Sequence, residues 1–181
     1  MSQAQEDATA GAERIESAEE IVRKAEEDVR SFSTKELIRN RLVVVIRAER
    51  QLKKILQLDP NTPLRDWVEE NLSKAQEILG QHYLLIARFY LSRYNDGSGR
   101  VKGAESRLLH IVREYPRFSQ TDEVLLLLGK IYKRTEQLED ATNYFWKLIC
   151  QHPTSEHVSE AYEQLGEIGF DAAKGCDNLK P

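Results

Sequence analysis

Three segments of the chain align without gaps: AERQLKKILQLDP at residues 48–60, AESRLLHIVREYP at 104–116 and ATNYFWKLICQHP at 141–153. In each, large apolar residues stand four, seven and eight positions after the first alanine, and proline stands twelve positions after it. Apolar residues at this spacing lie on one face of an α-helix. Proline closes a helix because it lacks the N–H group that would continue it. The segments therefore predict three equivalent helices that end at their prolines.

The residues around these segments extend the repeat, since Leu128-Gly129 and Leu165-Gly166 follow the last two prolines at the same distance. Two stretches match the tetratricopeptide pattern of paired helices, at Tyr83, Ile86, Ala87, Tyr90, Ala104, Leu108, Ile111 and Pro116, and at Leu125, Leu128, Gly129, Tyr132, Ala141, Phe145, Leu148 and Pro153. Such a repeat cannot bury its apolar face alone, so stacked neighbours close the core. The predicted fold is all-α, an α-solenoid of tetratricopeptide-like helix-turn-helix repeats, with Ala48, Ala104 and Ala141 at equivalent contacts between helices.

Sparse proline and glycine, and the near absence of alternating apolar and polar residues, favour helix throughout. We expect helices at 12–30, 34–58, 64–94, 101–114, 119–134, 137–151 and 155–170. Gly80 is expected to mark a bend or a break, and Gly169, which stands where the pattern has tyrosine, indicates that the last helix is a terminal cap. The predicted domains are an N-terminal acidic segment and helix at 1–31, a repeat domain at 32–170 and a polar C-terminal tail at 171–181.

Composition limits the function. With 181 residues, 40% of them hydrophobic, the chain is long enough to bury a core. Its net charge of −4 is too acidic for a dedicated nucleic-acid binder. No apolar run exceeds the five residues of Leu42 to Ile46, so we expect no membrane span. The opening MSQAQEDATAGAER lacks the basic start and apolar stretch of a secretion signal, which predicts a cytoplasmic protein or a trimmed mature form.

Charge is uneven near the start. Residues 1–30 contain nine acids and four bases, whereas residues 31–58 contain seven bases and two acids. The bases could form a patch for an acidic partner, the two helices could pair with each other, or the bases could be a solvated face. These alternatives stay open.

No sequence motif indicates an enzyme, a cofactor site or a metal site. The chain has no GxxxxGK[ST], HExxH or GxSxG motif. The spacing of Cys150, His152 and His157 fits no common zinc pattern. We expect Cys150 to be a small buried thiol beside Ile149.

Between the packing positions of the first helices stand Arg88, Lys130, Lys133 and Arg134. They predict a basic concave strip suited to acidic or carboxylate-bearing peptide segments, with solvated side chains as the alternative. Tyr83, Tyr90, Tyr132 and Phe145 are expected in the core. Tyr144 and Trp146 lie off the packing pattern and are expected to be exposed, which makes Trp146 a candidate interface residue.

Residues 74–166 resemble a narrower family, the outer-membrane assembly lipoproteins of the BamD (YfiO) type. The resemblance rests on HYLLIARFYLSR (82–93), RLLHIVREYP (107–116) and TDEVLLLLGKIY (121–132). The matching positions are Ala87, Phe89, Tyr90, Arg107, Tyr115 and Pro116. Residues 39–73 match more loosely, through the repeat at 48–60.

This resemblance implies a non-enzymatic periplasmic scaffold for the insertion of outer-membrane β-barrels. Its C-terminal repeats would bind the periplasmic domain of the barrel-assembly pore subunit, with Arg107 at the contact. Other assembly lipoproteins and nascent outer-membrane proteins are further implied partners. The implied location is the periplasmic side of the outer membrane if the full-length chain has a lipoprotein signal, and otherwise the cytoplasm. A cell-division, envelope-coordination or general tetratricopeptide adaptor protein is the alternative.

Overall fold

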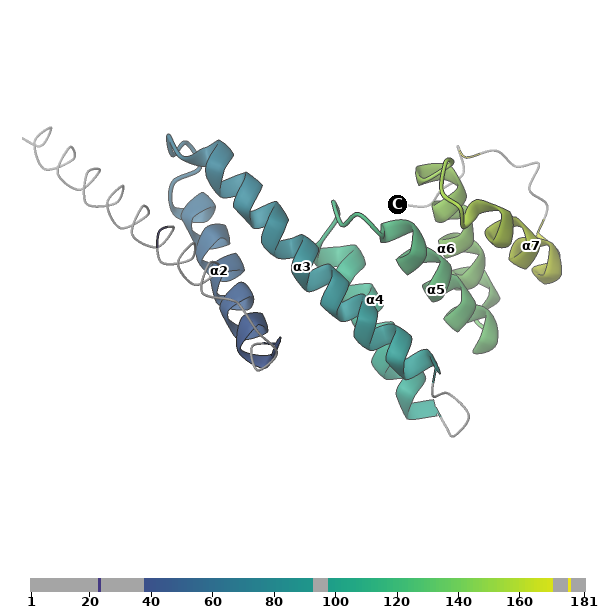
Figure 1. Ribbon diagram of the computed structural model, residues 1–181. Helices are drawn as coiled ribbons and strands as arrows, with labels where there is room; N and C mark the ends of the chain where they lie inside the picture. Colours follow the sequence, from purple (N-terminus) through teal and green to yellow (C-terminus); the bar gives the residue numbers. More distant parts are fainter. Residues whose placement is uncertain (1–22, 24–37, 93–97, 171–175, 177–181) are drawn as a thin grey trace, which may run out of the picture. The chain divides into compact units, whose positions relative to one another are not determined.

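The computed structural model of the protein describes residues 23, 38–92, 98–170 and 176, which form helices and no strand. The helices are α2 (Ile38–Leu58), α3 (Arg65–Ser92), α4 (Ser98–Glu114), α5 (Thr121–Arg134), α6 (Leu138–Gln151) and α7 (Val158–Ile168) (Figure 1). The all-α prediction is confirmed for this part of the chain. The expected helix at 12–30 lies outside the described residues. None of the described helices combines the length and apolar character that crossing a membrane requires.

The prolines and alanines of the aligned segments stand where the sequence predicts. Helices α2, α4 and α6 end at Leu58, Glu114 and Gln151, in each case two residues before the proline of the segment. Ala48, Ala104 and Ala141 are buried, with exposed fractions of 7%, 0% and 0%. The predicted helix ends and the predicted burial of the three alanines are therefore confirmed.

The chain divides into two compact units between Leu79 and Gly80, within α3. In the first unit, α2 and the first part of α3 enclose a small core. Its residues are Leu52, Ile55 and Val68, with Leu56, Leu64, Trp67 and Leu72 packed against them. The turn between the helices is tied by a hydrogen bond of 2.6 Å from Arg65 Nη1 to the Pro60 carbonyl oxygen. The chain thus turns at Pro60 and runs back along α2.

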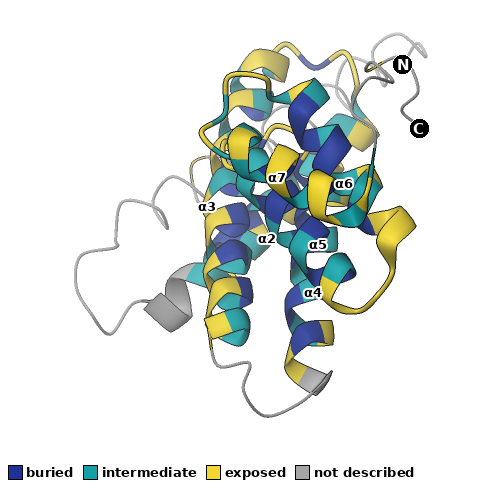
Figure 2. Cartoon of the chain, turned by 90° about the vertical axis from the view of Figure 1, so that its right-hand side faces the viewer, coloured by how far each residue is buried: buried dark blue, intermediate teal, exposed yellow. Residues whose placement is uncertain are grey.

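The second unit contains the remainder of α3 and the helices α4 to α7. Helix α5 packs against α4, α6 and α7, and α6 also packs against α7. Buried and exposed residues alternate along these helices in the manner of amphipathic elements (Figure 2). Apolar residues at helical spacing therefore bury one side of each helix against its neighbours.

Gly80 does not break the helix, since α3 runs through it. A Cβ atom placed on Gly80 would lie 2.5 Å from the Phe118 ring. The glycine therefore admits a close aromatic contact. Helix breaking is a weak expectation for one glycine inside a long helix, because its cost relative to alanine is only about 1 kcal/mol.

Helix α7 ends at a glycine in the left-handed region, Gly169, with φ of 78°. The N–H groups of Gly169 and Phe170 donate to the carbonyl oxygens of Gly166 and Leu165, both at 3.0 Å. Residues other than glycine are strained at this φ, and the two bonds satisfy carbonyl groups that the helix end leaves free. The glycine at the expected tyrosine position is thus the helix cap.

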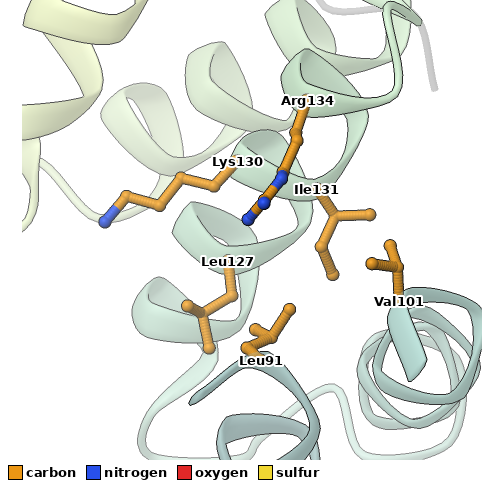
Figure 3. A pocket seen from close by; sticks show the side chains of 6 residues that line it. All are labelled: Leu91, Val101, Leu127, Lys130, Ile131 and Arg134. Carbon is orange, nitrogen blue, oxygen red and sulfur yellow. The ribbon is translucent and has the colours of Figure 1, made fainter. Parts of the chain in front are cut away.

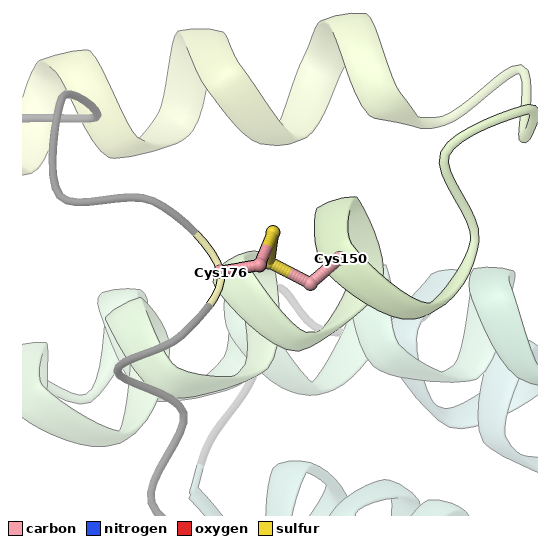
Figure 4. Close-up of a disulfide and its surroundings, with 2 residues drawn as sticks. All are labelled: Cys150 and Cys176. Atoms are coloured by element: carbon pink, nitrogen blue, oxygen red, sulfur yellow. A yellow bond between two sulfur atoms is a disulfide. The ribbon is translucent and has the colours of Figure 1, made fainter.

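The residues after α7 attach to α6 at two points. Phe170 packs on Trp146, with ring centroids 5.5 Å apart. Cys176 forms a disulfide with Cys150, which corrects the expectation of a buried free thiol (Figure 4). Trp146 and Cys150 stand four positions apart on α6, and residues at this spacing share a helix face. The repeat pattern does not predict this pairing, because Cys176 lies outside the repeat.

Candidate protein-binding site

Ion pairs connect α3 to α5 and α5 to α7. Arg88 Nε on α3 donates to Glu123 Oε1 on α5 at 2.6 Å, and Arg88 Nη2 donates to the other carboxylate oxygen. Lys130 Nζ on α5 lies 2.5 Å from Glu160 Oε1 on α7. Lys133 Nζ, one turn further along α5, contacts Gln164 Oε1 at 2.9 Å and pairs with Glu167. The same three helices therefore share one row of paired charges.

Two of these pairs repeat in the same register. Arg88 and Lys130 directly follow Ala87 and Gly129, the small residues of the tetratricopeptide pattern. Their acidic partners lie on α5 and α7, six positions before the glycine of the same helix: Glu123 before Gly129, and Glu160 before Gly166. Positions that are equivalent in the sequence alignment thus form the same kind of ion pair.

The helix ends favour these placements. Glu123 and Glu160 lie in the first turns of α5 and α7, where the partial positive charge of a helix N-terminus stabilises carboxylates. Lys133 lies in the last turn of α5, where cations are stabilised. The hydrogen bond that Arg88 donates to Glu123 raises the pKa of the Arg88 guanidinium. Because the Arg88 side chain is 47% exposed, its pair stabilises the fold by no more than about 1 kcal/mol.

The predicted basic strip is therefore a strip of paired charges. Arg88, Lys130 and Lys133 each lie against an acidic side chain of the neighbouring helix, and sequence reasoning missed all three acids. A signal was available for two of them, because Glu123 and Glu160 each stand six positions before a glycine of the aligned pattern, Gly129 and Gly166. Arg134, the fourth predicted cation, is exposed at the end of α5.

Beside this strip lies an apolar groove of about 190 Å³. Leu91 of α3, Val101 of α4 and Leu127 and Ile131 of α5 line it, together with Lys130 and Arg134 (Figure 3). In the figure the guanidinium group of Arg134 extends toward the apolar side chains, whereas the ammonium group of Lys130 points away from them. The groove is smaller than a typical site for a drug-sized molecule, so it suits one or two side chains of a peptide.

Arg107, the predicted docking residue, packs α4 onto α3. Its guanidinium carbon lies 5.2 Å from the centroid of the Tyr90 ring, a cation–π contact. Its Nη1 donates to the Gly103 carbonyl oxygen at 3.1 Å, and its buried Nε has no hydrogen-bond partner among the described residues. Gly103 allows this arrangement, since a Cβ atom there would lie 3.3 Å from the Tyr90 ring. A docking role for the half-buried Arg107 stays a prediction.

The expectation that Trp146 is exposed is wrong, because only 6% of the residue is accessible. Phe170 covers it, and Phe170 comes from beyond the last helix. Tyr144 is half-buried and stacks on Tyr132, with ring centroids 5.3 Å apart. The Tyr132 hydroxyl donates to Glu105 Oε1 at 2.9 Å. Burial raises the pKa of both phenols, and for Tyr132 this hydrogen bond adds to the effect.

Two of the aromatic residues expected in the core are indeed buried, Tyr132 and Phe145, with exposed fractions of 8% and 0%. Tyr83 and Tyr90 are only partly buried. Tyr83 contacts His110 and Tyr115, with ring centroids 4.8 Å and 6.2 Å away. These aromatic contacts join α3 to α4 and to the residue that follows α4.

The described residues contain no group of three or more His, Cys, Asp or Glu side chains that could hold a metal ion. The groove is lined by apolar side chains together with Lys130 and Arg134. Comparison of the chain with protein-family models and with curated proteins found no match in either.

Proposed function

We propose that this chain is a non-enzymatic scaffold, an α-solenoid of tetratricopeptide-like repeats that binds protein segments. The observation that carries the proposal is the recurrence of one ion pair in one register, Arg88 with Glu123 and then Lys130 with Glu160. Stacked equivalent helices are what a solenoid requires. Function in such arrays lies in the side chains of the helices that line the exposed face.

The groove is the proposed binding site within this scaffold. A bulky apolar side chain of a partner would lie among Leu91, Leu127 and Ile131, where it would be removed from water. The nearby guanidinium group of Arg134 would attract an acidic side chain or a terminal carboxylate of the same segment. The ligand would thus be an extended or helical peptide with an apolar anchor and an adjacent negative charge.

The resemblance to BamD-type lipoproteins suggests the partner. We propose that the chain binds the periplasmic domain of the barrel-assembly pore subunit, with other assembly lipoproteins and nascent outer-membrane proteins as further partners. The Cys150–Cys176 disulfide supports an oxidising compartment such as the periplasm, because disulfides are rare in the cytosol. Arg107 is the residue that the resemblance places at this contact.

Calorimetric titration of the chain with the periplasmic domain of the pore subunit from the same genome tests the proposal. Leu127→Glu would place a charge in the groove and weaken binding by about tenfold or more. Leu138→Glu is the matched control, since Leu138 is 47% exposed at the start of α6 and outside the groove. The melting temperature of both variants is recorded to separate binding from folding.

Two results would count against the proposal, and they differ in scope. If the unaltered chain does not bind the pore domain, the barrel-assembly role is wrong. If it binds and Leu127→Glu binds equally well while remaining folded, the groove is not the contact. A loss with Leu127→Ser as well as with Leu127→Glu would support the groove, because serine removes the apolar side chain without adding charge.

A further inference from the structure

One position of the aligned pattern, Gly129 on α5 and Gly166 on α7, is covered by a neighbouring side chain on α5 and open on α7. Gly129 and Gly166 are equivalent, since each follows the leucine that stands twelve positions after a segment proline. On α5, the ring of Phe145 from α6 packs so closely on Gly129 that a Cβ atom there would collide with it. At Gly166, no described atom lies within 4 Å of the corresponding Cβ position.

The neighbouring positions show the same difference. Four positions before the glycine, α5 has Leu125, which is 1% exposed, whereas α7 has Tyr162, which is 45% exposed. One position before the glycine, Leu128 and Leu165 are both buried, at 0% and 1%. Helix α7 therefore buries one side as α5 does, and exposes the side that α6 covers on α5 (Figure 2, yellow on α7).

The C-terminal residues that the structure describes attach elsewhere. Phe170 contacts Trp146 and Cys176 is bonded to Cys150, and both of these partners belong to α6. Tyr162 is thus exposed although Phe170 and Cys176 are both attached to α6. The open face of α7 has a place for a further helix.

Negative charge around this face favours a positively charged binding partner. Glu163 follows Tyr162 directly, is exposed, and has no ion-pair partner among the described residues. Glu156, in the turn before α7, is exposed in the same way. A second copy of the chain that docked face to face would bring these carboxylates together, which is unfavourable. A helix with lysine or arginine beside an aromatic residue would be complementary.

We propose that the face of α7 formed by Tyr162, Glu163 and Gly166 binds a basic amphipathic helix of a partner protein. An aromatic side chain of that helix would lie on Gly166 as Phe145 lies on Gly129, beside the Tyr162 ring. Basic residues on its flank would pair with Glu163. This site is separate from the groove, and it rests on the repeat arrangement of the proposed function.

The probe is a fluorescein-labelled synthetic peptide based on α6, residues 138–151, with both acids in its first turn replaced by lysine and its cysteine by serine. It keeps the aromatic residue equivalent to Phe145 and adds positive charge. Fluorescence anisotropy with the full chain, disulfide intact, measures its binding. A control peptide in which that phenylalanine is replaced by alanine should bind about tenfold more weakly.

Gly166→Leu is the decisive variant of the chain. It fills the open position with a better helix former, so the folded state should gain stability while the peptide loses about tenfold or more in affinity. Glu163→Gln should weaken binding several-fold and reduce its salt dependence. Glu114→Gln, at the end of α4, is the matched charge control and should change neither the peptide affinity nor its salt dependence.

The proposal is overturned if the peptide does not bind, or if Gly166→Leu leaves its affinity unchanged. It is also overturned if sedimentation shows that the chain alone forms a dimer which Gly166→Leu dissociates, because a second copy would then be the occupant. The groove is tested apart from it by Leu127→Glu, which should leave binding of this peptide unchanged.

Discussion

Arg88 and Glu123 lie 35 positions apart in the chain, and their side chains form a two-point ion pair between α3 and α5. An equivalent pair joins Lys130 of α5 to Glu160 of α7. An isolated surface ion pair is weak evidence for an arrangement, because many contribute little stability. A pair that recurs at equivalent positions instead reports how the helices are stacked.

A double-mutant cycle on Arg88→Ala and Glu123→Ala should give a coupling energy of about 0.2–1 kcal/mol in urea unfolding. The coupling should shrink in 1 M salt, since roughly 3 Å is then the screening length. The exchanged pair, Arg88→Glu with Glu123→Arg, should recover part of the lost stability. A coupling of zero at low salt would contradict the contact.

The two equivalent glycines should respond to alanine in opposite ways. Gly129→Ala would force the Phe145 ring from its place and should destabilise the fold by about 1–3 kcal/mol. Gly166→Ala meets no neighbour and should stabilise it by roughly 0.5–1 kcal/mol, because alanine loses less backbone entropy on folding. Urea unfolding of both variants under the same conditions decides the matter. Equal effects would mean that the two positions are not packed as described.

Reduction of the Cys150–Cys176 disulfide should lower the free energy of unfolding by about 2–4 kcal/mol, the range expected for a loop of this size. The Trp146 environment should become more polar as Phe170 leaves it, which a red shift of the fluorescence would show. Cys150→Ser with Cys176→Ser should behave like the reduced chain. If reduction changes neither quantity, the bond does not hold the tail on α6.

Stability should fall in acid through Asp122. Burial raises the pKa of this carboxyl, but the hydrogen bond from Ser155 Oγ at 2.6 Å, a backbone hydrogen bond and the nearby His157 and His152 together hold the pKa below its ordinary value of 3.8. A lowered folded-state pKa contributes stability above the unfolded pKa, and that contribution is lost as the pH falls through the folded value. The affected window therefore lies below about pH 4.

Ser155→Ala tests this assignment. Without the hydroxyl donor the pKa of Asp122 should rise, so unfolding measured between pH 3 and 7 should depend less on pH than in the unaltered chain. The absence of any change in this slope would place the acid sensitivity elsewhere.

Helix boundaries were the most predictable part of the molecule. Alanine and proline at fixed spacing act locally, through steric size and the missing N–H group. Each segment therefore predicts its own helix. The partners of Arg88 and Lys130 were harder to foresee, because such contacts depend on how one repeat stacks on the next. The acidic partners can be identified once Gly129 and Gly166 are aligned and the acids six positions before them are compared.

Trp146 and Cys150 show the opposite limit. Phe170 covers Trp146 and Cys176 is bonded to Cys150, and both of these residues lie beyond α7 and share no pattern with the repeat. Periodicity describes one face of a helix and the neighbour that follows it, and it contains no information about a segment that turns back. The groove was likewise unpredicted, because Leu91, Val101 and Leu127 come from three different helices.

Helix α5 holds both halves of the recurring pair, with Glu123 accepting from Arg88 of α3 and Lys130 donating to Glu160 of α7. A tandem duplication of the hairpin that begins with α5 would therefore meet its own copy with complementary charges already in place. Lineages could lengthen such a protein by whole hairpins without evolving a new junction, and engineers could do the same.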